Sequence, residues 1–408
     1  HCISSAASDV YKRQVLILGK GITGESFREY FSKKKQPFMT LDTRVKKESL
    51  NLKKNLNFNC INEGEIDFNN LKFIACSPGF DLNHNIIKTA KEKNIEIKSD
   101  INIFLEENTS KKILISGTNG KSTVCSWLEK LFNYQNLDTL AIGNIGRPVL
   151  EFVEEKKDFF VLEVSSFHLD IAPLPKFKLS VLLNITPDHI DRHGSFNEYA
   201  KIKKKISDSS EISIVNENLK EFIPQADYFF SNKGSIKDQN YNAIKEICSC
   251  LNLNFLEKDI LNCFAQLPHR MELFHQLDEN ITFIDDSKAT NVASSLEGLK
   301  SVDESKSLIV ICGGRSKDQD FKSFTDYLNK RAKKIYYFGE STKILKKLLD
   351  SSKSQEVSNL EEAVHSALKI IESDTVMILS PACSSLDMFE SFEERGKKFK
   401  DLVFNAKI

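Results

Sequence analysis

A glycine-rich turn in the first third of the chain has the residue types of a phosphate-binding loop. An apolar run over 112–116 leads into Gly117-Thr118-Asn119-Gly120-Lys121-Ser122-Thr123. Glycines expose backbone N–H groups, the following helix presents its positive end, and a lysine and a hydroxyl suit a triphosphate with Mg²⁺. The general pattern has glycine where this chain has Ile115, so the loop is a tighter variant. We predict ATP or GTP binding here; the alternative is an ordinary strand-to-helix turn.

A second glycine turn, Gly19-Lys20-Gly21-Ile22-Thr23-Gly24, lies near the start of the chain, and Asp42-Thr43-Arg44 follows about twenty residues later. This spacing is typical of a dinucleotide fingerprint, in which glycines admit a pyrophosphate at a helix start and the acidic residue contacts a ribose. A pyrophosphate is also the centre of a UDP-sugar. The turn therefore predicts a diphosphate ligand without selecting a nicotinamide, and a glycine turn with no ligand is the alternative.

Polar residues end two apolar runs downstream of the phosphate loop. Glu163 ends the run 159–163, and Asn184 ends the run 180–184 and leads to Asp188-His189. Ligands of open α/β sheets bind at the strand ends, and Mg²⁺-ATP chemistry requires oxygen ligands there. We therefore consider Glu163 and His189 as metal ligands. The alternatives are a helix-capping carboxylate for Glu163 and a structural histidine for His189.

The elements that must position these residues alternate between short apolar strands and amphipathic helices, which predicts an α/β fold with mostly parallel sheets. Three blocks are expected: 15–108, 109–266 and 267–408, with 1–14 as a disordered or non-native extension outside the fold. The expected strands are 15–19, 38–42, 73–77, 113–116, 159–163, 181–184, 281–285, 308–312, 335–338 and 376–379.

Composition excludes several classes of function. Lys+Arg and Asp+Glu both total 57, so no global charge favours nucleic acid or anionic lipid. The 9 cysteines are scattered without a C-x-x-C pair, which favours buried thiols in a reducing compartment over zinc or redox work. No apolar run approaches the roughly 18–20 residues of a membrane span. We expect a soluble, cytoplasmic monomer that binds neither nucleic acid nor membrane.

Several motifs in order resemble one family. The phosphate loop, Gly143-Asn144-Ile145-Gly146, Leu162-Glu163-Val164-Ser165-Ser166-Phe167 and Asn184-Ile185-Thr186-Pro187-Asp188-His189 are similar to those of the Mur ligases, whose relatives include folylpolyglutamate synthase. The resemblance covers essentially 15–408. It implies three domains: a Rossmann-like UDP-binding domain, a central P-loop ATPase-type domain and a Rossmann-like acceptor domain. It also implies ATP-dependent amide formation in bacterial peptidoglycan synthesis.

The third block resembles one branch of that family. Asp285-Asp286-Ser287-Lys288-Ala289-Thr290-Asn291 and the segment 380–396 are similar to the ligases that add D-glutamate to UDP-N-acetylmuramoyl-L-alanine. The implied reaction proceeds through an acyl phosphate, which converts a poorly electrophilic carboxylate into one with a good leaving group. ATP and two Mg²⁺ ions are the implied cofactors, because anionic reactants need cations around them.

The resemblance also implies roles for individual residues. Lys121 would hold the β- and γ-phosphates, and Lys203, counted from Tyr199, would be an N-carbamylated metal ligand beside His189; Lys201, Lys204 and Lys205 are the alternatives to Lys203. The implied metal ligands are Ser122, Glu163, His189 and Lys203. The implied nucleotide residues are Gly117, Thr118, Asn119, Gly120, Lys121, Ser122, Thr123, Arg270, Asp286 and Lys288. The implied UDP-substrate residues are Ile22, Thr23, Asp42, Thr43, Arg44, Ser77 and Asn144. The implied D-glutamate residues are Thr290, Lys317, Ser385, Leu386 and Phe392.

Some alternatives stay open. A nicotinamide-dependent oxidoreductase would use the first glycine turn and leave the Lys121 loop without a role. A non-catalytic nucleotide switch would use the loop but not Glu163, Lys203 and His189. Within the family, a ligase for another amino acid is the nearer alternative. The family has His-Asn where this chain has Gln239-Asn240, so either residue is a candidate adenine contact.

Overall fold

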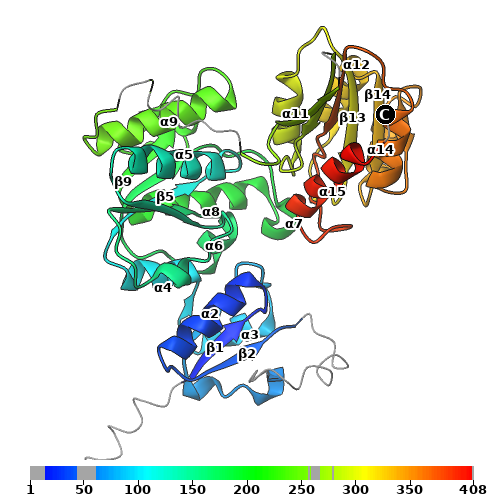
Figure 1. The fold of residues 1–408 in the computed structure, drawn as a ribbon. Coiled ribbons are helices and arrows are strands. Elements are labelled where there is room, and N and C mark those ends of the chain that lie inside the picture. The colour runs from blue at the N-terminus through cyan, green and yellow to red at the C-terminus, as the bar shows by residue number, and fades with distance from the viewer. Residues whose placement is uncertain (1–13, 44–60, 256–257, 259–266, 278–279, 407–408) are drawn as a thin grey trace, which may run out of the picture. The chain divides into compact units, whose positions relative to one another are not determined.

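The computed structural model describes residues 14–43, 61–255, 258, 267–277 and 280–406, so Arg44 and residues 1–13 lie outside the described part (Figure 1). The predicted α/β fold is confirmed: three sheets are present, and almost all their strands are parallel. The described residues divide into two compact units: those of the first lie within His1–Ile185 and Ala200–Cys263, and those of the second within Thr186–Tyr199 and Phe264–Ile408. The segment Thr186–Tyr199 thus groups with the third sheet, although the proposed central block contains it in sequence.

The first sheet has the parallel order β2-β1-β3-β4. Its strands are β1 (Gln14–Leu18), β2 (Phe38–Leu41), β3 (Leu71–Cys76) and β4 (Ile97–Lys98). Its helices are α2 (Ile22–Lys33), α3 (Asn85–Glu92) and the connecting α4 (Asp100–Glu107), with short 3₁₀ turns at Glu63–Glu65 and Phe68–Asn70. Alternate residues of β1 enter different cores, because successive strand side chains point to opposite faces: Val15 belongs to the cluster that contains Phe27, and Leu16 to the cluster that contains Ile87.

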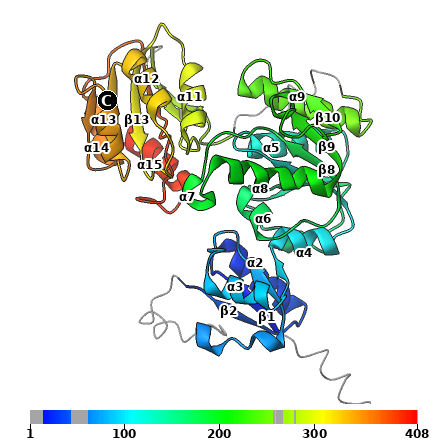
Figure 2. The ribbon, with the colours of Figure 1, turned by 180° about the vertical axis from the view of Figure 1, so that it is seen from behind.

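The second sheet is wholly parallel, in the order β10-β9-β8-β5-β7-β6. Helices α5 and α9 lie side by side on one face, and α6 and α8 lie on the other (Figure 1, Figure 2). The strands are β5 (Lys111–Ser116), β6 (Thr139–Gly143), β7 (Phe159–Glu163), β8 (Phe177–Leu182), β9 (Ser210–Asn216) and β10 (Tyr228–Phe230). The helices are α5 (Lys121–Tyr134), α6 (Ser166–Ile171), α8 (Phe196–Ser209) and α9 (Ile236–Cys250), with 3₁₀ turns at Val149–Phe152 and Glu217–Leu219.

The first two sheets share one hydrophobic core within their unit. Phe27 and Phe31 of α2, Phe104 of α4 and Phe160 of β7 belong to the same cluster of buried side chains. The rings of Phe104 and Phe160 meet edge to face at 5.1 Å between centroids. Because α4 connects the two sheets along the chain and contributes to this core, residues at its N-terminus are held at the junction between the sheets.

The third sheet has the order β11-β12-β16-β13-β14-β15, parallel except for β11 against β12. On β13, Val310 joins a core with α11, α12 and α13, and Ile311 joins another with α14 and α15. The strands are β11 (Glu272–Leu277), β12 (Ile281–Asp285), β13 (Ser307–Gly313), β14 (Lys334–Phe338), β15 (Ser354–Glu356) and β16 (Thr375–Leu379). The helices are α7 (Ile190–His193), α11 (Val292–Lys300), α12 (Lys322–Arg331), α13 (Thr342–Leu348), α14 (Leu360–Leu368) and α15 (Phe392–Phe404).

Four further expectations can be compared with the structure. Each expected strand is present, but the one expected at 181–184 ends at Leu182, so Asn184 belongs to the loop beyond it. Gln14, expected outside the fold, is the first residue of β1. Among the described residues, six cysteines are free thiols and five of these are buried. Within the described ranges, no helix has both the length and the apolar character needed to cross a membrane.

Candidate active site

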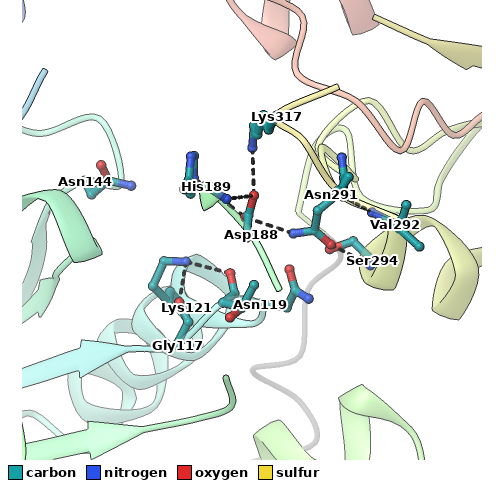
Figure 3. Close-up of polar contacts among 12 residues, drawn as sticks. Gly117, Asn119, Lys121, Asn144, Asp188, His189, Asn291, Val292, Ser294 and Lys317 are labelled. Atoms are coloured by element: carbon teal, nitrogen blue, oxygen red, sulfur yellow. Dashed lines mark hydrogen bonds and ion pairs between the residues drawn. The ribbon is translucent and has the colours of Figure 1, made fainter. Parts of the chain in front are cut away.

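The phosphate loop joins the end of β5 to the start of α5, as the sequence predicts. Gly120 is the N-cap of α5 with φ +86°, so the helix begins with its backbone N–H groups at Lys121 and Ser122. The Lys121 ammonium donates to the carbonyl oxygens of Gly117 at 2.9 Å and Thr118 at 2.8 Å (Figure 3). Lys121, the Ser122 hydroxyl and the N-terminus of α5 therefore lie together at the loop, and this combination of groups is typical of sites that bind a phosphate chain.

Two asparagines fix the shape of this loop. Asn184 accepts from the Asn119 N–H through Oδ1 at 2.8 Å and donates to the Asn119 carbonyl at 3.0 Å. A Cβ built on Gly120 would lie 2.5 Å from Oδ1 of Asn240, a buried residue of α9. Glycine at position 120 is thus required both by its left-handed φ and by the closeness of α9. Of the two candidate adenine contacts, Asn240 lies against the loop, whereas Gln239 contacts Asn216 and Gly234.

Lys203 of α8 contacts the same loop from the buried side. Lys203 is only 1 % exposed, and its Nζ donates to the Gly117 carbonyl at 2.9 Å and lies 3.5 Å from Ser116 Oγ. The Lys203 Nζ therefore lies directly against the phosphate loop. Lys205 instead contacts the Leu169 carbonyl at 3.3 Å.

Glu163 ends β7, the strand next to β5, so its carboxylate lies at the same sheet edge as the loop. It is 1 % exposed, and its Oε1 accepts from Asn144 Nδ2 at 2.9 Å. Asn144 follows β6, which pairs with the other side of β7. The buried Glu163 carboxylate and the Ser122 hydroxyl in the first turn of α5 thus lie at the same sheet edge. They are the hard oxygen donors that Mg²⁺ prefers, so these residues fit the implied metal.

A cavity of about 500 Å³ lies at the first glycine turn and extends to the central sheet. Its lining includes every residue expected to bind the UDP-substrate except Arg44, which lies outside the described residues. Asp42 Oδ2 accepts from the Lys20 N–H at 3.0 Å, which shapes the turn, and Ile22 is 75 % exposed at the start of α2. A Cβ on Gly24 would lie 2.1 Å from the Gly19 carbonyl, so glycine lets α2 begin against the strand end.

In the unit that contains the third sheet, the Asp188 carboxylate contacts two predicted site residues, Lys317 and His189, although the sequence did not single out Asp188. Asp188 Oδ1 accepts from Lys317 Nζ at 3.2 Å, and Oδ2 accepts from Asn291 Nδ2 at 3.2 Å (Figure 3). His189 is adjacent, with Nε2 3.6 Å from Asp188 Oδ2 and a left-handed φ of +53°. Burial alone would raise the pKa of Asp188, but the Lys317 ammonium, His189 and hydrogen bonds outweigh it and lower that pKa.

The expected acceptor residues come from loops after three neighbouring strands. Thr290 follows β12, Lys317 follows β13, and Ser385 with Leu386 follow β16, and the sheet order β12-β16-β13 brings these carboxyl ends together. Leu386 is 61 % exposed and Ser385 is buried. Nearby, the Lys288 ammonium lies 3.8 Å from the centroid of the Phe392 ring, a close cation–π contact.

Buried charges brace these loops from within. Asp286, expected to contact the nucleotide, accepts from the Met271 N–H at 3.1 Å and the Ser380 hydroxyl at 3.0 Å, and burial raises its pKa to about 7. It thus joins the Arg270–Met271 backbone to the loop after β16. Arg395 of α15 is fully buried and donates to Ser287 and to the Cys383 carbonyl, tying the loops after β12 and β16 together.

Sequence reasoning missed several residues that the site places centrally. Asp188 was quoted only as part of a motif, and the contact between the half-buried His269 (Nδ1) and the buried Asp285 (Oδ2), 2.6 Å apart, was not singled out. Asp100 and His168, which line the 500 Å³ cavity, were also missed. The Asp-His dipeptide could have pointed to Asp188. No local signal marks Asp100 or Arg395, whose partners are far away in the chain.

Comparison with known proteins agrees with this geometry. Three family models match the chain: the Mur ligase MurD-like N-terminal domain over residues 13–99, the Mur ligase middle domain over 115–255, and the Mur ligase glutamate ligase domain over 269–383. A UDP-N-acetylmuramoylalanine--D-glutamate ligase from Buchnera aphidicola is 32 % identical over 436 aligned residues, covering 96 % of this chain and 98 % of the relative.

Two solved structures share the fold. The UDP-N-acetylmuramate-alanine ligase of Thermotoga maritima gives a TM-score of 0.61 at 16 % identity, covering 97 % of this chain and 100 % of that one. The MurF ligase of Thermotoga maritima, in complex with ADP, gives 0.60 at 14 % identity, covering 98 % and 99 %. Because a relative above 30 % identity spans nearly the whole of both chains and the three domain models match in order, this chain belongs to the Mur ligase family.

Proposed function

We propose that this chain joins D-glutamate to UDP-N-acetylmuramoyl-L-alanine at the expense of ATP, a step in peptidoglycan synthesis. The observation that carries the proposal is the end-to-end match to relatives with the name UDP-N-acetylmuramoylalanine--D-glutamate ligase. The geometry supports it, since a phosphate loop, a cavity at the first glycine turn and a buried lysine, Lys317, at the strand ends of the third sheet are parts that such a reaction requires.

The first step activates a carboxylate. The terminal carboxylate oxygen of the UDP-linked substrate forms a bond to the γ-phosphorus, the bond from that phosphorus to the β–γ bridging oxygen breaks, and ADP leaves. Lys121 and the N–H groups at the start of α5 hold the phosphates and offset the charge that shifts onto the leaving oxygen. Ser122 and Glu163 would hold Mg²⁺, which supplies Lewis-acid charge stabilisation when bound.

The second step forms the amide. The amine nitrogen of D-glutamate attacks the acyl carbonyl, a tetrahedral intermediate forms, and the carbon–oxygen bond to phosphate breaks. The ammonium of D-glutamate loses one proton to solvent before attack, the nitrogen loses a second proton as the tetrahedral intermediate collapses, and phosphate leaves as the anion that can take up that second proton. Lys317 and the Thr290 hydroxyl would bind the carboxylates of D-glutamate, with Ser385 and Phe392 at the same strand ends. Asp188 keeps the Lys317 ammonium in place.

Further parts of the proposal concern metal ligands, location and organisation. His189 and an N-carbamylated Lys203 would hold a second Mg²⁺, because carbamylation replaces an ammonium by an anionic oxygen ligand. We place the enzyme in the cytoplasm as a monomer, with domains at 15–108, 109–266 and 267–408. A nicotinamide dehydrogenase would leave Lys121 and Glu163 without a role.

The proposal is tested by phosphate release with ATP, Mg²⁺ and UDP-N-acetylmuramoyl-L-alanine, comparing D-glutamate with L-glutamate, L-alanine and L-lysine. D-Glutamate alone should stimulate release, and Lys121→Met should abolish it with every acceptor. Absence of stimulation by D-glutamate would rule out the assignment.

The acceptor pocket is tested separately with Thr290→Val, and Thr290→Ser serves as the matched control because it keeps the hydroxyl. Loss of one hydrogen bond to a carboxylate costs about 1.5 kcal/mol, so KM for D-glutamate should rise roughly tenfold in Thr290→Val while KM for ATP stays unchanged. An equal rise in both constants would contradict the placement of Thr290.

A further inference from the structure

A buried histidine and aspartate face each other where the 500 Å³ cavity meets the central sheet. His168 of α6 and Asp100, the first residue of α4, both line this cavity. They are 4 % and 3 % exposed, and His168 Nε2 lies 3.6 Å from Asp100 Oδ1. The proposed reaction leaves both residues without a role, although burying two polar side chains is costly unless their hydrogen-bonding capacity is used.

The hydrogen bonds of Ser165 decide which ring nitrogen of His168 carries the proton. The Ser165 backbone N–H, which can only donate, points at His168 Nδ1 at 3.4 Å, and Ser165 Oγ lies 2.7 Å from the same atom. Nδ1 is therefore the acceptor, and in the neutral ring the proton is on Nε2. Burial lowers the pKa of His168, more than the nearby Asp100 and Glu163 raise it, which favours that neutral ring. His168 thus directs an N–H donor toward Asp100.

The donor and the acceptor are placed for a third group. At 3.6 Å, Nε2 and Oδ1 are beyond a normal direct hydrogen bond, but one hydroxyl oxygen can accept from Nε2–H and donate to Oδ1 at the same time. Asp100 Oδ1 also accepts from the Ile101 N–H at 3.0 Å, which fixes the carboxyl group at the helix start. Burial raises the pKa of Asp100, but a carboxyl oxygen accepts a hydrogen bond in either protonation state, so the complementary group is the neutral, hydroxyl-bearing part of a ligand.

We propose that Asp100 and His168 together recognise a sugar hydroxyl of the nucleotide-sugar substrate, and so make the cavity specific for the sugar portion beyond the UDP. Elsewhere in the lining of the same cavity, the glycine turn that contains Gly19 and Gly21 suits the diphosphate. The proposal rests on the proposed function only in that the ligand is a UDP-linked sugar.

The test is direct binding measured by calorimetry without ATP, using UDP and UDP-N-acetylmuramoyl-L-alanine as separate ligands. Two substitutions of His168 form a matched pair. His168→Gln keeps a nitrogen donor where Nε2 lies, whereas His168→Asn keeps a polar atom where Nδ1 lies and removes the donor. We expect His168→Asn to bind the sugar nucleotide about tenfold more weakly and UDP equally well, with His168→Gln within about threefold of wild type for both. Asp100→Ala should match His168→Asn.

The double variant Asp100→Ala/His168→Asn provides a second readout. Because one hydroxyl would bridge both groups, its loss of affinity should be well below the product of the two single losses. Equal weakening of UDP and of the sugar nucleotide, or no weakening of either, would overturn the proposal. ATP affinity of each variant reports whether the central domain is folded. If wild-type protein binds neither ligand, the proposed function fails instead, so the two failures are distinguishable.

Discussion

The buried ion pair between Asp188 and Lys317 should control the local stability of the segment that carries His189. Their side chains are 7 % and 9 % exposed, and their charged atoms lie 3.2 Å apart. At an effective dielectric constant of about 20 this separation corresponds to about 5 kcal/mol of attraction, and desolvation of both ions offsets part of it. Asp188→Asn keeps the shape and the contact with Asn291 but leaves a buried ammonium uncompensated, which should cost about 3 kcal/mol.

Hydrogen exchange followed by mass spectrometry measures this cost locally, which suits a chain of several domains. Exchange in the peptide that covers 186–199 should accelerate roughly 100-fold in Asp188→Asn, because each 1.4 kcal/mol changes the opening equilibrium tenfold. The double variant Asp188→Asn/Lys317→Met carries no buried charge and should recover most of the protection. Peptides from β5 serve as the internal control.

Two results would refute this reasoning. Unchanged exchange in Asp188→Asn would mean that the pair contributes nothing, and additive losses in the double variant would mean that the two side chains act independently. Acid provides a further check. Because the pKa of Asp188 is lowered on folding, its stabilisation is complete above about pH 4, the unfolded value, and is lost as pH falls below it. Wild type and Asp188→Asn should therefore converge in acid.

Two further predictions concern the phosphate loop and a buried carboxyl. Gly120→Ala places a Cβ 2.5 Å from Asn240 at a left-handed φ, so the affinity for ATP should fall at least tenfold. In the control Gly21→Ala the new Cβ meets no atom within 4 Å, so the affinity for ATP should be unchanged. Equal ATP affinities of the two variants would contradict the steric argument. Burial raises the pKa of Asp286 to about 7. Between about pH 4 and 7 the folded state therefore keeps a proton on Asp286 that the unfolded state has lost, so the free energy of unfolding falls as the pH rises through that range. The melting temperature of Asp286→Asn relative to wild type should rise across the same interval, and a constant difference would contradict the raised pKa.

Local pattern was enough to predict the strands that hold the chemistry. The runs 159–163 and 281–285 coincide with β7 and β12, because buried parallel strands read as continuous apolar segments. The glycine turn before α5 was recognisable in the sequence because its positive-φ backbone favours glycine at Gly117 and Gly120. Six strands of the described residues were not among those expected: β4, β6, β9, β10, β11 and β15. Two of these are short or polar, since β4 has two residues and β15 reads Ser-Gln-Glu. Such strands form because a neighbouring strand offers hydrogen bonds.

The partners of the functional side chains were beyond the reach of sequence reasoning. Asp188 and Lys317 are 129 residues apart, and no periodicity relates them. They meet because the segment Thr186–Tyr199 joins the compact unit of the third sheet. Likewise, Asp100 and His168 are brought together by the core that α4 shares with the central sheet.

The sequence by itself therefore determined the fold class, the phosphate loop and the family motifs, since each depends on residues within one or two turns of chain. Only the tertiary structure decided that Lys317 is held by Asp188, that Asn240 lies against Gly120, and that His168 faces Asp100. Hydrogen bonds and charges act over a few ångströms in space, and the distance along the chain does not specify that separation.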